Sequence, residues 1–315
     1  MDPLWNPKNP DDSAIAAFMQ DVNSEFKTQF STYHELWRWS VEYSQDFWFH
    51  WWNWASPLAS KQPTRVLVNE DSFEQSTWFP DAELNFAENL LRFRDSQKAI
   101  IFRDEDGNRR SLSYAELYQI TGSVAAEFEK LGITKGDRVA AILPNLPETI
   151  IAMLATTWLG AVWSSCSPDF GTDGILERFK QIEPRLLIAC DGYKFKGKIY
   201  PILDKVNSIR DQLNCKTIVV NWQSNDMLAS AIPWEELIKT EAPFPEFSQV
   251  NFNDPVYILY SSGTTGKPKC IVHGVGGTLL QHLKEHRLHT DVTREDTLFY
   301  FTTCGWMMWN WLVSG

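Results

Sequence analysis

The stretch VYILYSSGTTGKPKC, residues 256–270, decides the fold and points to the chemistry of this chain. Its first five residues are mostly apolar and predict a buried β-strand that ends at Tyr260. The loop that follows combines glycines, hydroxyl side chains and lysines. Glycine lets backbone N–H groups turn toward an anion, hydroxyls add hydrogen-bond donors, and lysines add positive charge. The stretch therefore predicts a buried strand that leads directly into a phosphate-binding loop.

The loop differs in spacing from two common nucleotide-binding loops. Only two residues separate Gly263 from Gly266, and Pro268 follows Lys267, so this is not a Walker A loop. The G-x-G-x-x-G pattern of dinucleotide-binding folds is also absent. An ordinary flexible loop is the alternative, but the strand, the hydroxyls, the glycines and the lysines together favour phosphate binding. The candidate phosphate-binding residues are Ser261, Ser262, Gly263, Thr264, Thr265, Gly266, Lys267 and Lys269.

Short apolar runs alternate with helical patterns along the rest of the chain. The segment 98–113 predicts a β-hairpin, because Asp106-Gly107 is a strong turn signal. A helix is predicted to follow, where Ser113 and Glu116 have capping-box spacing. Buried runs separated by helices are typical of a largely parallel sheet, so we predict an α/β fold flanked by helices. Further strands are predicted at 138–143, 161–165, 185–189, 216–220 and 297–303, with helices that start near 147 and cover 174–181.

The first 91 residues are crowded with aromatic side chains, most densely in DFWFHWWNW, residues 46–54. One interpretation is a platform on which nucleic-acid bases stack, and the other is core packing beneath a larger domain. No lysine or arginine is interleaved with these aromatic residues. The pattern therefore favours core packing.

Composition limits the class of protein. A chain of 315 residues, 43% of them hydrophobic, is long enough for a sizeable core and for two domains. Its net charge of −11 at pH 7 would repel a nucleic-acid backbone, so we expect no nucleic-acid partner. The five cysteines include no C-x-x-C pair, which argues against a zinc ribbon and a disulfide framework. With no signal peptide and no apolar run of roughly 20 residues, we expect a cytoplasmic protein without a membrane partner.

The string YSSGTTGKPK resembles the signature of the adenylate-forming superfamily. The segments LSYAELY (112–118), LGITKGDRVAAILPNLPETI (131–150) and LGAVWSSCSPDFG (159–171) resemble earlier conserved stretches of that superfamily, in the same order. The resemblance runs from about residue 84 to the end. It implies a large N-terminal domain in which the loop binds the β and γ phosphates of ATP, together with Mg²⁺. It further implies that a carboxylic acid becomes an acyl-adenylate.

Other segments narrow the resemblance to CoA ligases. HELWRWSVEYSQDFW (34–48) and WFPDAELNFAENLL (78–91) resemble an extension of acetyl-CoA synthetases. CIVHGVGGTLLQHLKEHRLHTD (270–291) and FTTCGWMMWNWLVSG (301–315) resemble the acetoacetate–CoA ligases. The resemblance implies small-molecule substrates, namely ATP, coenzyme A and a short acid, with acetoacetate favoured and an acetyl-CoA-synthetase-like substrate as the alternative. We expect two domains, an extension over 1–91 and a partial AMP-binding domain over 92–315.

The resemblance also implies sites for the acyl group and for coenzyme A. Trp306 matches an aromatic residue that walls the acyl pocket of acetyl-CoA synthetases, and Met307 follows it. The alternative is that both side chains belong to the core. Lys196 and Lys198 align with a basic segment that binds the 3′-phosphate end of coenzyme A. That segment uses arginines in acetyl-CoA synthetases, so a solvated charged loop is an equal alternative.

A different enzyme class is the rival hypothesis. His282, Glu285 and His286 fit the H-x-x-E-H pattern of a zinc metallopeptidase, in which two histidines one helical turn apart bind the metal. Five-residue motifs arise readily by chance, so an ordinary helix with partly exposed histidines is favoured and no metal ligand is assigned.

The chain ends within the apolar run WNWLVSG, without a polar tail or a closing turn. In the superfamily, a smaller C-terminal lid domain carries the lysine that assists adenylation. We therefore expect a truncated chain whose lid domain is absent and which holds no assigned catalytic residue. A fragment without activity of its own is the corresponding alternative.

Overall fold

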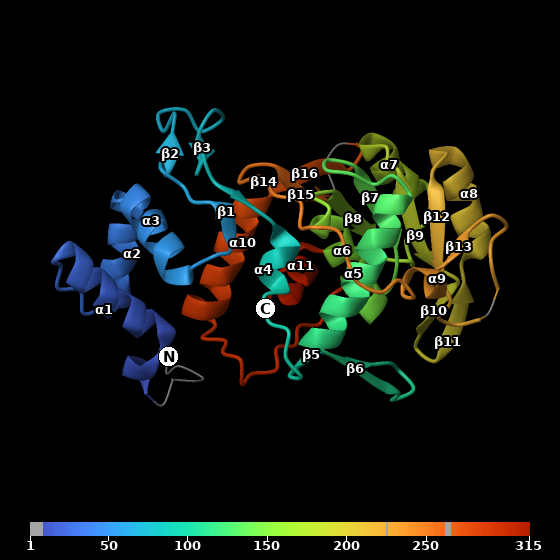
Figure 1. Cartoon of the computed structure of the whole chain (residues 1–315), viewed down its shortest axis with the longest axis horizontal. Helices are drawn as coiled ribbons and strands as arrows, with labels where there is room; N and C mark the ends of the chain where they lie inside the picture. Colours follow the sequence, from blue (N-terminus) through green and yellow to red (C-terminus); the bar gives the residue numbers. More distant parts are fainter. Residues whose placement is uncertain (1–8, 225, 262–265) are drawn as a thin grey trace.

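The centre of the molecule is a seven-stranded sheet in the order β13-β12-β9-β7-β8-β15-β16 (Figure 1). The computed structural model describes residues 9–224, 226–261 and 266–315. The first six strands pair in parallel, and β16 alone pairs antiparallel, with β15. The predicted α/β class with a mostly parallel sheet is confirmed. The strands are β7 (Arg138–Ile142), β8 (Val162–Cys166), β9 (Leu186–Cys190), β12 (Lys216–Val220), β13 (Ile232–Pro233), β15 (Pro255–Ser261) and β16 (Lys269–Gly274).

The central strands are buried on both faces. Every residue of β8 and of β9 is buried, which is why these segments read as continuous rather than alternating apolar runs. The predicted strands at 138–143, 161–165, 185–189, 216–220 and 256–260 each correspond to an observed strand. The return strand β16 was not expected, because four of its residues are exposed and it lacks an apolar run.

Helices cover both faces of the sheet (Figure 1). The helix α6 links β7 to β8 on one side, whereas α7 links β8 to β9 on the other side of β7. Because such crossovers are right-handed, α6 and α7 lie on opposite faces, where α5 packs with α6 and α8 with α7. The predicted capping box of Ser113 and Glu116 begins α5. The helices are α5 (Tyr114–Lys130), α6 (Pro147–Trp158), α7 (Thr172–Ile182), α8 (Leu203–Leu213) and α9 (Trp234–Leu237).

Two β-hairpins lie outside the central sheet. The predicted hairpin is confirmed as β5 (Lys98–Arg103) and β6 (Arg109–Ser113), with Gly107 at a positive φ of 85° in its turn. A second hairpin, β10 (Gly192–Phe195) and β11 (Lys198–Pro201), follows β9 directly. It was not predicted, because its strands have only four residues each and neither contains an apolar run, and β11 is mostly exposed.

The aromatic N-terminal region packs against the rest of the chain. Phe18, Trp51 and Trp52 are almost fully buried, and the indole N–H of Trp51 donates to the carbonyl of Leu280 over 3.1 Å. These contacts fit the core-packing interpretation, and Figure 1 shows α3 beside α10. The elements here are η1 (Pro10–Asp12), α1 (Ala14–Phe26), α2 (Tyr33–Glu42), α3 (Ser44–Ala55), β1 (Ala59–Lys61), β2 (Leu67–Val68), β3 (Thr77–Trp78), β4 (Glu83–Leu84) and α4 (Phe86–Leu90), and β14 (Val250–Asn251) pairs with β4.

The C-terminal part differs from the sequence-based expectation. The strand predicted at 297–303 is wrong: in the described residues this segment pairs with no strand, and Phe299 and Phe301 are 79% and 91% exposed. An apolar pattern supplies side chains for a strand but not the neighbouring backbone that a strand must bond. The helices here are α10 (Val275–Lys284), a π-helical turn η2 (Glu285–His289), and α11 (Met307–Val313).

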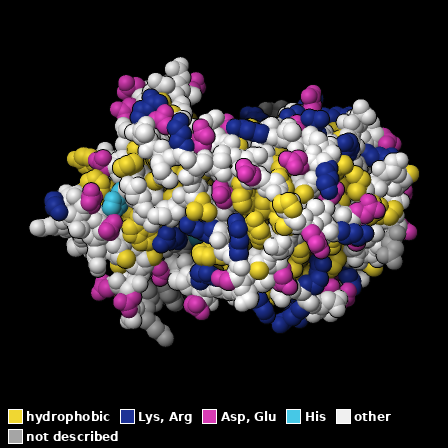
Figure 2. All heavy atoms as spheres, viewed as in Figure 1, with side chains coloured by type: hydrophobic (Ala, Val, Ile, Leu, Met, Phe, Trp, Pro, Cys, Tyr) yellow, Lys and Arg dark blue, Asp and Glu magenta, His cyan; other side chains and the backbone are white. Residues whose placement is uncertain are grey.

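The surface carries charges of both signs. Basic and acidic side chains are interspersed with apolar ones over the face shown in Figure 2. Among the helices of the described residues, none has the length and apolar character needed to cross a membrane. All five cysteines lie in the described part of the chain and are free thiols.

Candidate functional site

The carboxyl ends of β7, β8, β9 and β15 lie at one edge of the sheet, because these strands run parallel. At this edge the chain leaves β7 toward one face and β8 toward the other. Parallel α/β sheets bind their ligands beside such a change of direction, outside the carboxyl ends of the strands. Three of the predicted site segments begin or dock at this edge.

The first segment is the predicted phosphate-binding loop after β15. Ser261 ends β15 and pairs in register with Lys269 at the start of β16, so the loop closes a hairpin. Lys267 and Lys269 are exposed, and Gly266 has a φ of 148°, which L-residues rarely adopt. The other four predicted residues lie outside the described residues: Ser262, Gly263, Thr264 and Thr265.

Side chains from β8 and α7 support the base of this hairpin. The Ser164 hydroxyl donates to the carbonyl of Ile258 over 2.9 Å, and its oxygen lies 3.1 Å from the hydroxyl of Tyr260. Burial raises the pKa of Tyr260 well above its usual value, so the phenol stays neutral. The Gln181 amide donates to the carbonyl of Pro268 over 2.9 Å. Polar contacts with β8 and α7 therefore hold the described ends of this hairpin loop in place.

The second segment, 304–309, docks directly on the ends of β7 and β8. The Ser165 hydroxyl donates to the carbonyl of Cys304 over 2.6 Å, and the Cys304 thiol donates to the carbonyl of Leu143 over 2.8 Å. Burial raises the pKa of the Cys304 thiol to about 12, which keeps the donating proton in place. The indole N–H of Trp309 donates to Asn145 over 2.9 Å.

This docking separates residues that are adjacent in sequence. Trp309 is fully buried, whereas Trp306 is 67% exposed and Met307 is 46% exposed. Trp309 therefore belongs to the core, whereas the core alternative does not fit the exposed Trp306 and Met307. The two predicted acyl-pocket residues are consecutive at the start of α11, and both are exposed.

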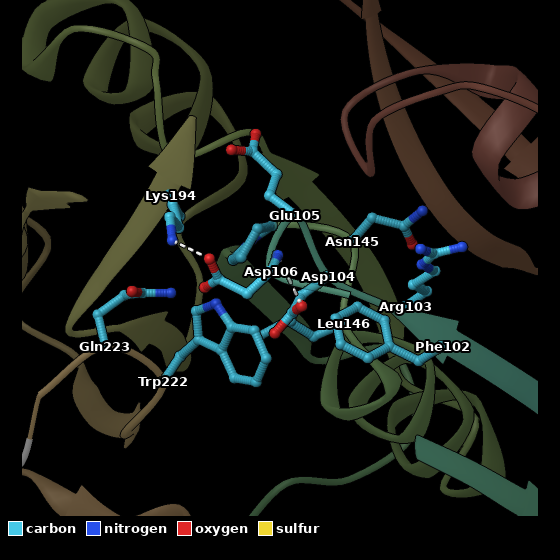
Figure 3. Close-up of a pocket in the computed structure, with 11 residues that line it drawn as sticks. Phe102, Arg103, Asp104, Glu105, Asp106, Asn145, Leu146, Lys194, Trp222 and Gln223 are labelled. Atoms are coloured by element: carbon cyan, nitrogen blue, oxygen red, sulfur yellow. Dashed lines mark hydrogen bonds and ion pairs between the residues drawn. The ribbon is translucent and has the colours of Figure 1, made fainter. Parts of the chain in front are cut away.

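The third segment is the hairpin β10–β11, which carries the predicted coenzyme A lysines. Lys194 forms an ion pair with Asp106 over 2.5 Å, which raises the pKa of Lys194, whereas Lys196 and Lys198 are exposed. The Lys194 and Asp106 side chains meet in a cleft of about 170 Å³ between the two outer hairpins, where Trp222 lies opposite (Figure 3). Of the three lysines, Lys196 and Lys198 are the ones left facing solvent.

The residues of the rival zinc motif have other partners. His282 lies 2.8 Å from the Ser314 hydroxyl, and His286 lies 2.9 Å from the carbonyl of Trp311. Glu285 pairs with Lys284 over 2.8 Å. Within the described ranges, no three histidine, cysteine, aspartate or glutamate side chains are grouped closely enough to hold a metal ion.

Sequence reasoning missed the residues that connect these segments to the sheet. Ser164 and Ser165 are polar residues inside the fully buried strand β8, and that break in an apolar run was an available signal. Cys304 and Asn145 gave no comparable signal, because their partners lie far away in the sequence.

Comparisons with known proteins agree with this arrangement. Residues 86–315 match the profile of the AMP-binding enzyme family. The chain is 45% identical to the acetoacetyl-coenzyme A synthetase of Rhizobium meliloti (strain 1021) over 323 residues, which cover 99% of this chain and 49% of that protein. It is 38% identical to the acetoacetyl-CoA synthetase of Xenopus tropicalis over 327 residues, with the same two coverages.

A solved structure is similar over the whole chain. The acetoacetyl-CoA synthetase from Streptomyces lividans superposes with a TM-score of 0.95 at 38% identity, covering 100% of this chain and 50% of that one. The chain thus spans about half the length of the curated relatives it matches. Since the family profile covers most of the chain, this protein belongs to the AMP-binding enzyme family.

Proposed function

We propose that this protein takes part in activating a short carboxylic acid, acetoacetate, with ATP and in transferring the acyl group to coenzyme A. The observation that carries the proposal is the 45% identity to an acetoacetyl-coenzyme A synthetase across 99% of this chain. The similarity includes segment 304–309, which docks at the sheet edge that also bears the loop after β15. A site for an acid and a site for phosphates at one edge suit a reaction that joins the two.

The proposed reaction has two steps. A carboxylate oxygen of the acid attacks the α-phosphorus of ATP, the bond to the β-phosphate oxygen breaks, and pyrophosphate leaves. The sulfur of coenzyme A then attacks the acyl carbonyl carbon, the thiol proton goes to solvent or a base, and AMP leaves. The reaction requires charge stabilisation on the phosphate oxygens more than covalent help from the protein.

The described loop residues have suitable chemistry for that task. Lys267 and Lys269 are exposed cations, and Lys269 pairs in register with Ser261 across the hairpin. The two lysines would neutralise charge on the departing pyrophosphate. Mg²⁺ bound with the nucleotide would add positive charge that stabilises the phosphates. For the other substrates, Trp306 and Met307 would form a wall beside the acyl group, and Lys196 and Lys198 would pair with the 3′-phosphate of coenzyme A.

We also propose that the chain divides into an extension, residues 1–91, and a partial AMP-binding domain, residues 92–315.

The decisive experiment is exchange of labelled pyrophosphate into ATP. It compares this chain with the product of the full reading frame, with acetoacetate and acetate as rival acids. Exchange that is strongest with acetoacetate supports the proposal, and exchange that is strongest with acetate favours an acetyl-CoA-synthetase-like enzyme. A well-folded full product that shows no exchange with any short acid refutes the adenylation step.

Two sets of variants test the separate sites. Trp306→Ala should change the preference between acetoacetate and acetate, and an unchanged preference would refute the acyl-pocket assignment.

Lys196→Ala combined with Lys198→Ala should raise the KM for coenzyme A while leaving pyrophosphate exchange intact. Lys239→Ala, which removes an exposed lysine elsewhere, is the matched control. An unchanged KM for coenzyme A would refute the role of the hairpin lysines.

A further inference from the structure

The proposed function leaves the motif HLKEH, residues 282–286, without a role. Its two histidines are buried and face α11 from α10 and the π-helical turn. The Nδ1 atom of His282 lies 2.8 Å from the Ser314 hydroxyl, which donates to the carbonyl of Trp311 over 2.8 Å. The Nε2 atom of His286 lies 2.9 Å from that same carbonyl. His286 therefore contacts the Trp311 carbonyl directly, whereas His282 reaches it only through the Ser314 hydroxyl.

The hydrogen-bond directions follow from the acceptors. A carbonyl only accepts, so Nε2 of His286 carries the proton and donates to Trp311. The single Ser314 hydrogen goes to the same carbonyl, so the Ser314 oxygen accepts from Nδ1–H of His282. Each ring then donates from one nitrogen and is neutral. Burial is the largest cause that lowers the pKa of both rings, which agrees with this assignment.

The contacts of His282 and His286 stabilise the C-terminal end of α11, a short helix that would be unstable by itself. The helix α11 has seven residues, and isolated helices of that length are unstable in water. The last carbonyls of a helix lack the usual intrahelical donors. The Trp311 carbonyl, in the last turn of α11, accepts instead from the Ser314 N–H over 3.2 Å and from the Ser314 hydroxyl over 2.8 Å. The two histidines supply donors to that end, and the His286 ring packs on the Trp311 ring with centroids 4.4 Å apart.

The opposite end of α11 is held by the sheet. The Trp309 indole binds Asn145 after β7, and the Cys304 backbone binds Ser165 on β8. Trp306 and Met307 are exposed and lie in the sequence between the Cys304 and Trp309 anchors. From Trp309, α11 continues to the histidine contacts at its other end. Their side-chain positions therefore depend on how firmly α11 is fixed at both ends.

We propose that His282 and His286 are positioning residues that fix α11 and thereby orient Trp306 and Met307 toward the acid. The catalytic part of this inference rests on the proposed function, whereas the anchoring of α11 stands on the contacts alone. His282 and His286 touch no proposed substrate and act only through the helix.

Hydrogen–deuterium exchange on this chain tests the anchoring. His282→Ala and His286→Ala should each speed exchange in segment 305–315, because the first removes the donor to the Ser314 hydroxyl and the second removes a donor to the Trp311 carbonyl. The matched control is His289→Ala, since His289 lies on the same turn but contacts Lys284, Glu285 and Tyr33 instead. Rescue should come from His282→Asn and His286→Gln, whose amide nitrogens replace the donating ring nitrogens. Equal exchange in all variants and the control would overturn the anchoring role.

Steady-state pyrophosphate exchange on the full-length protein tests the orienting role. His286→Ala should raise the KM for acetoacetate by about tenfold, because a small displacement of positioning groups is costly. The KM for ATP should stay within about twofold, and His286→Gln should restore the KM for acetoacetate. An equal change in both KM values, or none, would overturn the orienting role. Absence of exchange in the wild-type protein would instead refute the proposed function, and deuterium exchange would still decide the anchoring.

Discussion

Ser165, Cys304 and Asn145 each use one polar group to hold segment 304–309 against the sheet. In the buried interior such a bond matters mainly because its loss leaves a carbonyl or an amide without a partner. The bonds are few, and each joins residues that are more than a hundred positions apart in the chain. Single substitutions here should therefore affect both stability and the neighbouring candidate acyl site.

Ser165→Ala should destabilise the protein by about 1–3 kcal/mol, because the buried carbonyl of Cys304 loses its donor. In the proposed enzyme, the same change should raise the KM for acetoacetate. Chemical unfolding and pyrophosphate exchange measure the two effects. Ser60→Ala is the control, because the Ser60 hydroxyl makes an exposed bond far from this edge. Stability equal to wild type would show that the Ser165 bond contributes nothing.

Lys267→Ala should lower the rate of pyrophosphate exchange by roughly tenfold to a hundredfold, because an exposed cation is lost from the phosphate loop. The free energy of unfolding should not change, since the side chain makes no buried contact. Lys239→Ala is the matched control for loss of one positive charge. A normal exchange rate in Lys267→Ala would exclude this lysine from the phosphate site.

Two helices carry glycines whose surroundings differ sharply. In α5, a Cβ placed on Gly122 would lie 2.3 Å from the ring of Phe244, in the loop that precedes β14. In α10, a Cβ on Gly277 would meet nothing within 4 Å. The first glycine is required by packing between elements, whereas the second only weakens its helix.

Gly122→Ala should lower the free energy of unfolding by about 1–3 kcal/mol, because Phe244 must move. Gly277→Ala should raise it by up to about 1 kcal/mol, because alanine favours the helix. Thermal or urea unfolding of the two variants distinguishes these opposite signs. A stabilised Gly122→Ala protein would contradict the close contact with Phe244.

The contact of α10 with α11 should make stability depend on pH. Burial, followed by the charges of His286 and His273, lowers the pKa of His282 to about 4, while Glu285 acts in the opposite direction. The unfolded chain therefore binds more protons than the folded one between about pH 6.5 and pH 4. Stability should fall as pH drops through this window, with His282 contributing on the order of 2–3 kcal/mol. Urea unfolding at several pH values should show a smaller dependence in His282→Asn, and an identical dependence would refute the assignment.

The N-terminal region is joined to the sheet region over a broad contact. The Asn85 amide donates to the carbonyls of Thr157, Trp158 and Ser248, and the Phe79 and Phe252 rings pack with centroids 4.9 Å apart. These contacts complete the core beneath α6 and α10 rather than forming a separate hydrophobic centre.

A chain that begins at residue 92 should therefore fail to fold cooperatively. Such a chain lacks Asn85 and Phe79. Without the Asn85 amide the carbonyl of Ser248 loses its donor, and without the Phe79 ring the Phe252 ring becomes exposed. Size-exclusion chromatography and thermal unfolding are the measurements, with the 315-residue chain as reference. A soluble monomer with a cooperative transition would show that residues 1–91 are dispensable for folding.

The main strands and helices could be predicted because their signals are local. The apolar runs of β7, β8 and β9 reflect burial on both faces, and the Ser113–Glu116 capping box spans only three residues. The prediction of phosphate binding for the loop after β15 rests on a signal that is also local, because its glycines, hydroxyls and lysines are consecutive in sequence. These features needed no knowledge of distant partners.

Other features followed from contacts between distant segments. The chain near residue 300 reads as a strand, yet in the described structure it finds no neighbouring strand and stays exposed. Trp306 and Trp309 are alike in sequence, but docking on Asn145 buries one and leaves the other exposed. The histidines of HLKEH suggest a metal site until Trp311 is seen to accept from His286. Local pattern describes what a residue can do, and its burial and partners are set by segments that meet only when the chain has folded.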